Sequence, residues 1–255
     1  MFHNLQLHSR LFLLSVFTMV VAQGAFAATV VIPNAQTSVE ANESNAFPFG
    51  RTLTSKDPYR YQQVYNASGF GEQAAPITID EIRFRPDSNN FFATAITVQS
   101  VQVWLSTTDA VADELDNVTF DNNIGTGASL VHSGELIWPM PTITAEPRPF
   151  ELVIRVRPRF EYDPSAGNLL LEVYNNSASF PVGYTLDLEE AVDETSRVVE
   201  TVIPGTNTHE IAAIPAGTSR GLVTQFVYNT PEPGTLGTGI AALLALAALR
   251  RPRIA

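Results

Sequence analysis

Cysteine is absent from the 255 residues of this chain. Its absence excludes disulfide bonds and cysteine nucleophiles, so a folded domain must be stabilised by core burial or by bound ions. Histidine is also scarce, and His132 and His209 are the two that lie in the central part of the chain, too few for a histidine-rich metal site. Both lie in loop-like sequence beside Ser, Gly or Thr, so we expect them to be exposed bystanders.

Several common catalytic motifs are missing as well. The sequence has no H-E-x-x-H, P-loop or Rossmann G-x-G-x-x-G pattern, which mark common metalloprotease and nucleotide-binding sites. A carboxylate pair for glycoside hydrolysis stays open as an alternative, because such pairs meet in space rather than in sequence. The sequence therefore predicts a protein that is not an enzyme and that has no cofactor apart from the calcium considered below.

Long hydrophobic runs occur only towards the two ends. Near the C-terminus, the 16 residues from Gly234 to Leu249 carry no charge. As a helix rising about 1.5 Å per residue this run would span roughly 24 Å, against about 30 Å for the core of a bilayer. A polar tripeptide precedes the run and three arginines follow it: Pro231, Glu232, Pro233 and Arg250, Arg251, Arg253. The prolines favour extended backbone that a protease can read, and the arginines favour a cytoplasmic C-terminus, so we expect a single transmembrane helix.

This ending, residues 231–255, resembles the PEP-CTERM sorting signal that exosortases read in the envelope of Gram-negative bacteria. The tripeptide, the apolar helix and the basic terminus occur in the same order and together cover about a tenth of the chain. The resemblance implies that an exosortase-like membrane protease cuts near Pro231 to Pro233. It also implies that the rest of the chain is then released or transferred to the cell surface or the extracellular matrix. The alternative is an ordinary single-span anchor that is never cut.

The N-terminus predicts export by the same route. Arg10 supplies a basic region, Leu11 to Ala22 form an apolar stretch of 12 residues, and Ala25-Phe-Ala27 is a small-x-small cleavage box. This pattern is typical of a secretory signal peptide, here residues 1–27, that the secretion machinery and signal peptidase would process after Ala27. The alternative is a retained N-terminal membrane helix, for which the apolar stretch is short.

Between these ends lies a body of about 200 residues, 28–230, which is long enough for one domain with a sizeable core. It keeps 11 basic residues against 25 acidic ones, a net charge of −14. A body of this charge repels nucleic acid and anionic membrane surfaces, and we expect no nucleic acid among its partners.

The apolar residues of the body follow the period of β-strands. In Phe150–Arg157, alternate residues are apolar and charged, and the same alternation recurs in several segments separated by Pro, Gly, Asn and Asp. In the segments 77–84 and 96–105 the apolar phase slips by one residue midway, as a β-bulge requires. We therefore predict an all-β fold, a curved, jelly-roll-like antiparallel β-sandwich. The alternative is that each of the two segments is a pair of short strands broken by a turn.

Three groups of residues are candidate sites. Asp113, Asp116 and Asp121 lie in an acidic, Asn-rich loop that offers hard oxygen ligands for calcium, although the spacing is not that of an EF-hand. The alternative is a solvated loop without an ion.

Arginines form the second group. Arg155 and Arg157, with Arg159, lie on one face of a strand, and Arg83 and Arg85 alternate outward in another. If the two strands are neighbours, they form a basic ribbon suited to a carboxylated or sulfated polysaccharide. The alternative is cross-strand pairing with acidic residues, of which the candidates are Glu151, Glu161 and Glu172.

The two tryptophans are the third group. Trp104 is in the phase opposite to Val103 and Leu105, which points it outward as a platform for a sugar ring, while Trp138 ends an apolar run. Packing in the core is the alternative for both.

Taken together, these patterns predict an exported protein that passes through an inner-membrane intermediate to the cell envelope surface or the exterior. We expect it to have a structural or adhesive role in an extracellular polysaccharide layer. The alternative is a carbohydrate-binding module that uses Trp104 or the arginines, and a secreted glycoside hydrolase is a third possibility.

Overall fold

The computed structural model describes residues 26–51, 57–73, 76–88, 95–138, 145–191, 193–202, 208–212 and 220–230. Several sequence predictions fall outside these residues: the signal peptide up to Ala25, the sorting motif Pro231, Glu232 and Pro233, the apolar run Gly234–Leu249 and the basic residues Arg250, Arg251 and Arg253. Within the described ranges, no helix has the length and apolar character that crossing a membrane requires.

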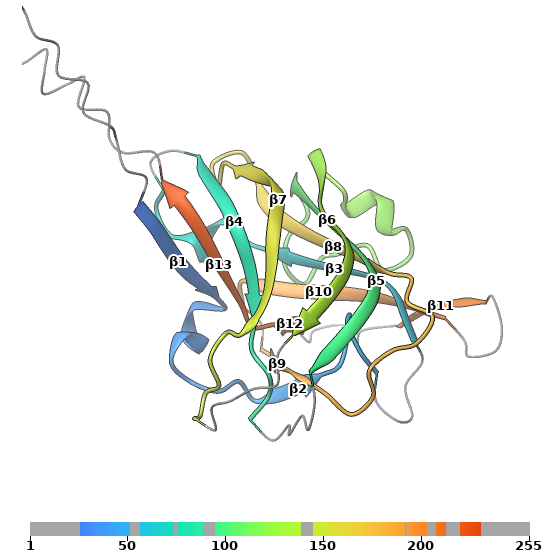
Figure 1. Ribbon diagram of the computed structural model, residues 1–255. Helices are drawn as coiled ribbons and strands as arrows, with labels where there is room; N and C mark the ends of the chain where they lie inside the picture. Colours follow the sequence, from blue (N-terminus) through green and yellow to red (C-terminus); the bar gives the residue numbers. More distant parts are fainter. Residues whose placement is uncertain are drawn as a thin grey trace, which may run out of the picture.

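The fold is all-β, with three sheets whose ladders are antiparallel (Figure 1). A four-stranded sheet has the order β1 (Phe26–Ile32), β13 (Thr224–Thr230), β4 (Ile77–Phe84) and β7 (Leu152–Tyr162). A six-stranded sheet has the order β11 (His209–Ala212), β10 (Thr195–Val202), β3 (Asp57–Tyr65), β8 (Asn168–Asn175), β5 (Ile96–Thr108) and β6 (Thr126–Trp138). The smallest sheet has the order β12 (Gly221–Leu222), β9 (Leu186–Glu189) and β2 (Glu43–Asn45). Three short 3₁₀ helices lie in the connections: η1 (Asn34–Thr37), η2 (Ala67–Phe70) and η3 (Phe120–Asn123).

One apolar core lies between the larger sheets, which gives the fold its sandwich-like character. The strand predicted from Phe150–Arg157 forms β7 from Leu152 onward, and Phe150 and Glu151 lie before its start. Leu152, Ile154 and Val156 are fully buried and Arg155 and Arg157 are exposed, as the alternation predicts. Side chains of the opposite sheet complete the core, and burial of this apolar surface is the main stabilising term of such a domain.

Aromatic rings form part of this core. Phe226 of β13 packs edge-on against Tyr65 of β3 with ring centroids 4.9 Å apart, and against Phe70 of η2 at 5.2 Å. These contacts connect the two larger sheets through rings that bury large areas, so they replace the cross-links that a chain without cysteine cannot form.

The two phase slips are β-bulges within continuous strands. In the β13–β4 ladder, Val227 and Tyr228 lie opposite Glu81 and Ile79, so Asp80 is an extra residue on β4. In the β5–β6 ladder the register shifts between Val98 and Val101, with one extra residue on β5. The prediction of bulged strands is therefore confirmed, and the alternative of broken strand pairs is wrong. Each bulge returns the apolar residues that follow it to the core face of the sheet.

Strands β1 and β13, the first and last of the described residues, pair with each other. Phe26 lies opposite Thr230, and Ala27, the predicted cleavage residue, lies opposite Asn229. The beginning of β1 and the end of β13 are therefore neighbours at one end of the four-stranded sheet (Figure 1).

Candidate functional site

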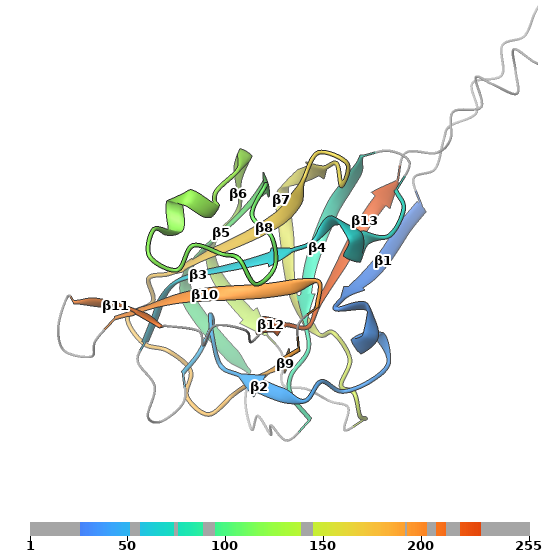
Figure 2. The same ribbon diagram turned by 180° about the vertical axis from the view of Figure 1, so that it is seen from behind.

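Residues 109–125, which connect β5 to β6, fold over the outer face of the six-stranded sheet; Figure 2 shows this green segment in front of β3 and β8. Residues of the segment and of the sheet form a small apolar cluster apart from the main core: Val64, Ala112, Leu115, Ile124 and Leu170. Polar contacts also hold the segment in place, because Thr108 Oγ1 donates a hydrogen bond to the Asn123 carbonyl at 2.7 Å. It covers part of this face and forms one wall of the hollow described below.

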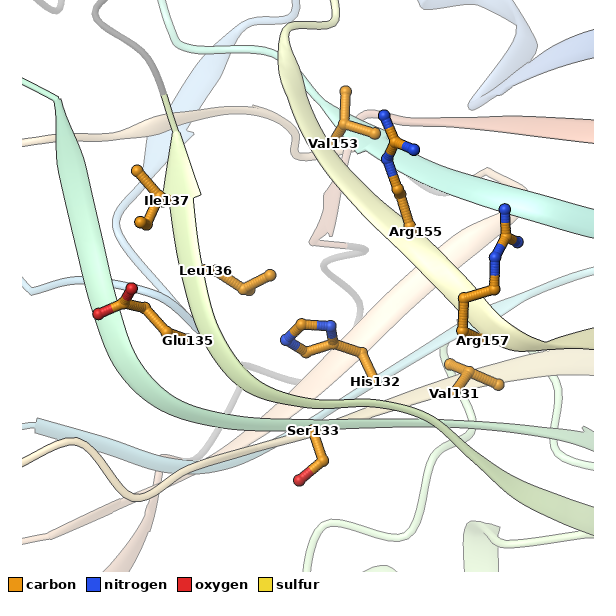
Figure 3. Close-up of a pocket in the computed structure, with 9 residues that line it drawn as sticks. All are labelled: Val131, His132, Ser133, Glu135, Leu136, Ile137, Val153, Arg155 and Arg157. Carbon is orange, nitrogen blue, oxygen red and sulfur yellow. The ribbon is translucent and has the colours of Figure 1, made fainter.

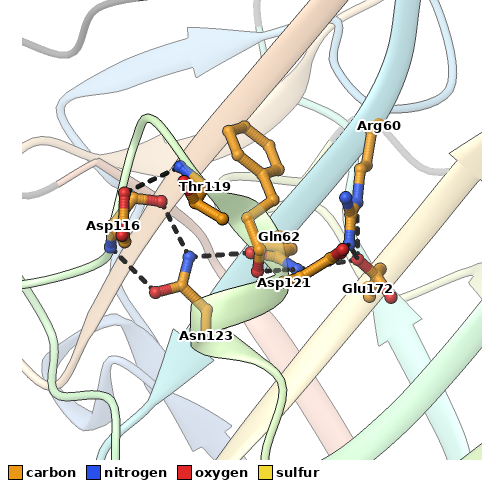
Figure 4. Close-up of polar contacts among 8 residues, drawn as sticks. Arg60, Gln62, Asp116, Thr119, Asp121, Asn123 and Glu172 are labelled. Carbon is orange, nitrogen blue, oxygen red and sulfur yellow. Dashed lines mark hydrogen bonds and ion pairs between the residues drawn. The ribbon is translucent and has the colours of Figure 1, made fainter.

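A buried polar network joins the segment to the sheet (Figure 4). Gln62 is fully buried, and its Nε2 donates to the Phe120 carbonyl at 3.0 Å and to Glu172 Oε1 at 2.7 Å. Its Oε1 accepts a hydrogen bond from Asn123 Nδ2 at 2.9 Å. Arg60 donates through Nε to the same Glu172 oxygen at 2.7 Å. The network fixes the position of Glu172, because several donors converge on one of its oxygens.

Asp116, a predicted calcium ligand, forms hydrogen bonds within its own loop. Its carboxylate accepts hydrogen bonds from the backbone N–H groups of Val118 and Thr119, each at 2.8 Å, and from Asn122 Nδ2 at 2.7 Å. The bond from Thr119, followed by those from Asn122 and Val118, lowers the pKa of Asp116 below its usual value. This carboxylate therefore stabilises the turn that leads into η3.

The other two predicted ligands do not join it. Asp121 lies 2.7 Å from Arg60 Nη2 in an ion pair (Figure 4), and Asp113 turns the backbone with a φ of 69°. Among the described residues, the acidic side chains that meet closely enough to share an ion are three others, Glu40, Asp87 and Asp187. The structure therefore does not assemble the calcium site predicted from Asp113, Asp116 and Asp121.

One of these three carboxylates, Asp187, is paired with a buried arginine. Arg85 Nε lies 2.5 Å from Asp187 Oδ2, and its terminal nitrogens donate to two backbone carbonyls within residues 36–39. Burial raises the pKa of Asp187 to about 6, although the charge of Arg85 opposes this effect. The contacts of Arg85 and Asp187 join the end of β4 to β9 and to residues 36–41, which we call the N-terminal arm. We call this set of contacts the Arg85 clasp.

The outer face of the six-stranded sheet carries a hollow of about 460 Å³ beside residues 109–125. Aromatic, polar and small apolar side chains line it: Tyr59, Trp104 and Tyr174; Gln102, Glu172 and Asn176; Ile124 and Ala128. We call it the aromatic hollow. Trp104 is half-buried, whereas Val103 and Leu105 on either side of it are fully buried, so its predicted outward phase is confirmed.

The aromatic rings of the hollow are held in place by their neighbours. Tyr59 and Tyr174 pack edge-on with centroids 6.2 Å apart, and the guanidinium of Arg60 lies 5.1 Å from the Tyr174 ring centroid. Burial raises the pKa of Tyr174 to about 12, so its phenol is neutral at physiological pH. In the β5–β8 ladder, Trp104 lies opposite Glu172. The hollow thus joins ordered ring faces to a carboxylate and amides.

Sequence reasoning identified only part of this site. It found Trp104 from its phase, but it missed Tyr59 and Tyr174, whose strands lie far from Trp104 in the chain. Only the pairing of β3, β8 and β5 brings these rings together. Trp138 packs in the core, which was the alternative for both tryptophans: it is 1% exposed and packs edge-on against Phe49 with ring centroids 4.8 Å apart.

The predicted basic ribbon is only partly present. β4 and β7 are neighbours, as it requires, but Arg85 is buried in its clasp because the chain leaves β4 after Phe84 and passes under the N-terminal arm. Arg83 pairs with Glu81 at 2.5 Å, and Arg159 pairs with Asp80 at 2.6 Å. The first pair lies within β4, whereas the second crosses from β7 to β4, so cross-strand pairing occurs with an acidic residue other than those predicted. Arg155 and Arg157 remain exposed on β7.

Neither the hollow nor the histidines form a recognisable catalytic arrangement in the described part of the chain. Glu172 is the one carboxylate that lines the hollow, and Arg60 holds it at 2.6 Å, whereas glycoside hydrolysis uses a pair. His132 is half-buried beside β7, and the side chain of His209 lies outside the described residues. No family model, curated protein or solved structure matches this chain.

Proposed function

We propose that this chain is an exported surface protein whose β domain binds a saccharide chain in the aromatic hollow. The observation that carries the proposal is the meeting of Trp104, Tyr59 and Tyr174 with Gln102 and Glu172 in one hollow of about 460 Å³. This volume lies in the usual range for small-ligand pockets, roughly 300–1,000 Å³.

The chemistry of the hollow suits a sugar better than a purely apolar ligand. Sugar rings have apolar C–H faces that pack on aromatic rings, and hydroxyl groups at their edges that need both donors and acceptors. Glu172 accepts, whereas Gln102 and Asn176 can donate and accept, and all three lie beside the rings. Arg60 holds Tyr174 and Glu172, so little ordering entropy is lost on binding.

Export and sorting complete the proposal. In this scheme signal peptidase cuts after Ala27, an exosortase-like protease cuts near Glu232, and the domain reaches the cell surface or the extracellular matrix. The support is the resemblance of residues 231–255 to the PEP-CTERM signal and the pairing of β1 with β13, which puts both attachment points at one end of a sheet. Saccharide binding then gives the domain an adhesive role in a polysaccharide layer.

We also propose that the bulges of β4 and β5 curve the sheets in a jelly-roll-like manner.

Binding is tested on a glycan array with the full-length chain purified in detergent. We expect saturable binding of the wild type, and an affinity about tenfold lower for Trp104→Ala, because the variant loses one stacking surface. Trp104→Phe keeps a ring and should retain most of the affinity. Val182→Ala, an exposed change away from the hollow, is the matched control and should bind like the wild type. An array without saturable ligands, or unchanged binding by Trp104→Ala, would contradict the proposal.

Sorting is tested separately with the double variant Glu232→Ala, Pro233→Ala. We expect it to accumulate as an uncut precursor in the inner membrane, which intact mass measurement of the membrane and external fractions would show. Release of this variant at the wild-type rate, or external protein that still carries residues 234–255, would contradict the sorting proposal and leave the saccharide site unaffected.

A further inference from the structure

A second hollow lies where the two larger sheets meet. β7 is the edge of the four-stranded sheet and β6 is the edge of the six-stranded sheet, and the two edges run beside each other without forming a ladder in the described part of the chain. The groove between them has a volume of about 440 Å³ (Figure 3). Its lining combines apolar and basic side chains: Val131, Leu136, Ile137 and Val153 with His132, Arg155 and Arg157. We call it the seam groove.

The charges of the two arginines are poorly neutralised. Glu81 lies opposite Arg155 in the β4–β7 ladder, but its carboxylate is 2.5 Å from Arg83. Within the described residues no carboxylate lies at ion-pair distance from Arg155. Arg157 lies 3.8 Å from Asp80, whose closer partner is Arg159 at 2.6 Å. Two guanidinium groups two residues apart on one strand are therefore available to an anion, on a domain whose net charge is strongly negative.

The other titratable groups of the groove do not cancel this charge. Glu135 also lines the groove, but Figure 3 shows its side chain directed towards β5, away from Arg155. The imidazole of His132 lies between β6 and β7, and burial lowers its pKa, with the backbone of Gly134 opposing this effect. His132 is therefore neutral at physiological pH, and the arginines supply the positive charge.

The edges of the groove are unsuited to an added β-strand. On β6, Gly134 has a φ of 134° and lies at the register shift opposite Val101. On β7, Pro158 has no N–H to donate, and it lies between the charged residues Arg157 and Arg159. Bulges, prolines and charges are the devices that prevent edge strands from pairing with another chain. A discrete ligand fits these edges better than a peptide strand does.

We propose that the seam groove binds a carboxylated sugar unit, a uronate residue of an acidic polysaccharide. The carboxylate accepts hydrogen bonds from Arg155 and Arg157, and the sugar ring packs on Leu136 and Val153, which line the groove with them. This apolar lining distinguishes the ligand from a bare inorganic anion, which would leave Leu136 and Val153 unused. The site involves other strands than the aromatic hollow does and requires no binding there.

Calorimetric titration of the full-length chain in detergent tests the proposal. The probes are tetragalacturonate, neutral maltotetraose and inorganic sulfate. We expect saturable binding of tetragalacturonate alone, weakened about tenfold in Arg155→Gln and further in Arg155→Gln with Arg157→Gln, because each change removes a charge-assisted hydrogen bond. Arg159→Gln is the matched control, since it removes the same charge from the same strand outside the groove, and it should change the affinity less than about twofold. Trp104→Ala should bind the uronate normally.

Other outcomes would overturn the proposal in distinguishable ways. Equal losses in Arg159→Gln and Arg155→Gln would show attraction by overall charge, and sulfate binding as tightly as the uronate would show a bare anion site. Absence of saturable uronate binding would show that the seam groove is not a uronate site. Loss of uronate binding in Trp104→Ala would place the ligand in the aromatic hollow. The substituted arginines are exposed, so folding of each variant is checked by its thermal unfolding curve.

Discussion

Two arginine–carboxylate pairs in this domain have the same chemistry and different surroundings. In the Arg85 clasp, Arg85 and Asp187 are 1% and 0% exposed, and backbone carbonyls accept the remaining hydrogen bonds of the guanidinium. In the pair formed by Arg60 and Glu172, the side chains are 13% and 8% exposed, and the guanidinium lies over a ring of the aromatic hollow. The first pair holds segments of the fold together, whereas the second positions groups that a ligand can reach.

Burial is what separates the two roles. A sealed pair has lost its hydration completely, so removing one partner leaves an isolated charge in the interior. A pair at the edge of a hollow keeps some contact with water, and its loss is better tolerated by the fold. Three predictions test this difference, from the largest expected effect to the smallest.

Asp187→Ala should have the largest effect. The change leaves Arg85 buried without its carboxylate, and we expect the free energy of unfolding to fall by about 3–5 kcal/mol. Urea unfolding followed by tryptophan fluorescence would measure it. Arg83→Ala, which breaks the half-exposed pair with Glu81, is the control and should cost less than about 1 kcal/mol. Similar decreases in the free energy of unfolding of the two variants would show that the buried Arg85 clasp contributes no more to stability than the pair with Glu81 does.

Arg60→Gln should have an intermediate effect on stability and a clear effect on binding. The variant loses the ion pairs with Glu172 and Asp121 and the cation over Tyr174, at a cost of about 1–2 kcal/mol in the free energy of unfolding. Because Tyr174 and Glu172 then lose their support, saccharide affinity should fall about tenfold.

The matched control for this variant is Arg51→Gln, which breaks the pair with Asp57 at 3.1 Å outside the hollow and should leave binding unchanged. Equal affinities of the two variants on the same glycan would remove the distinction between a pair that supports a binding site and an ordinary surface pair.

The pH dependence of stability should show the smallest effect. Burial raises the pKa of Asp193 to about 7 and that of Asp187 to about 6, both above the usual value of 3.8. The native state therefore binds more protons than the unfolded state between about pH 4 and pH 7, and stability should decline as the pH rises through this window. His132 acts in the opposite direction, because its pKa is lowered.

Urea unfolding at pH 5 and pH 8 checks this prediction. We expect a difference on the order of 1 kcal/mol in favour of pH 5, after allowance for the partial exposure of Asp193. Asp193→Asn keeps an acceptor for the Thr195 N–H and should flatten the dependence. A variant that is as sensitive to pH as the wild type would exclude Asp193 as a source. Below about pH 4, the lowered pKa of Asp116 predicts that the loop before η3 loses stability.

The sequence was informative where the physics is local. Alternation in β7 predicts which side chains are buried, and the phase slips in β4 and β5 predict the bulges, because strand periodicity follows directly from the chain. The outward phase of Trp104 follows from the same rule.

Sequence reasoning was uninformative where distant segments meet. Arg85 looks like an exposed strand residue until the N-terminal arm covers it and Asp187 reaches it from more than a hundred residues away. The acidic loop resembles an ion site in the sequence, but in the structure the backbone N–H groups of the loop donate hydrogen bonds to the carboxylate of Asp116. In both cases the decisive partner is set by tertiary contacts, which no local pattern encodes.

The position of β13 has a consequence for the order in which the domain is built. Although it is the last strand that the structure describes, it lies inside its sheet, with β1 on one side and β4 on the other. Until residues 224–230 arrive, the first strand has no ladder in this sheet and β4 keeps one bare edge. A chain that stops before β13 therefore cannot complete the four-stranded sheet that begins with β1.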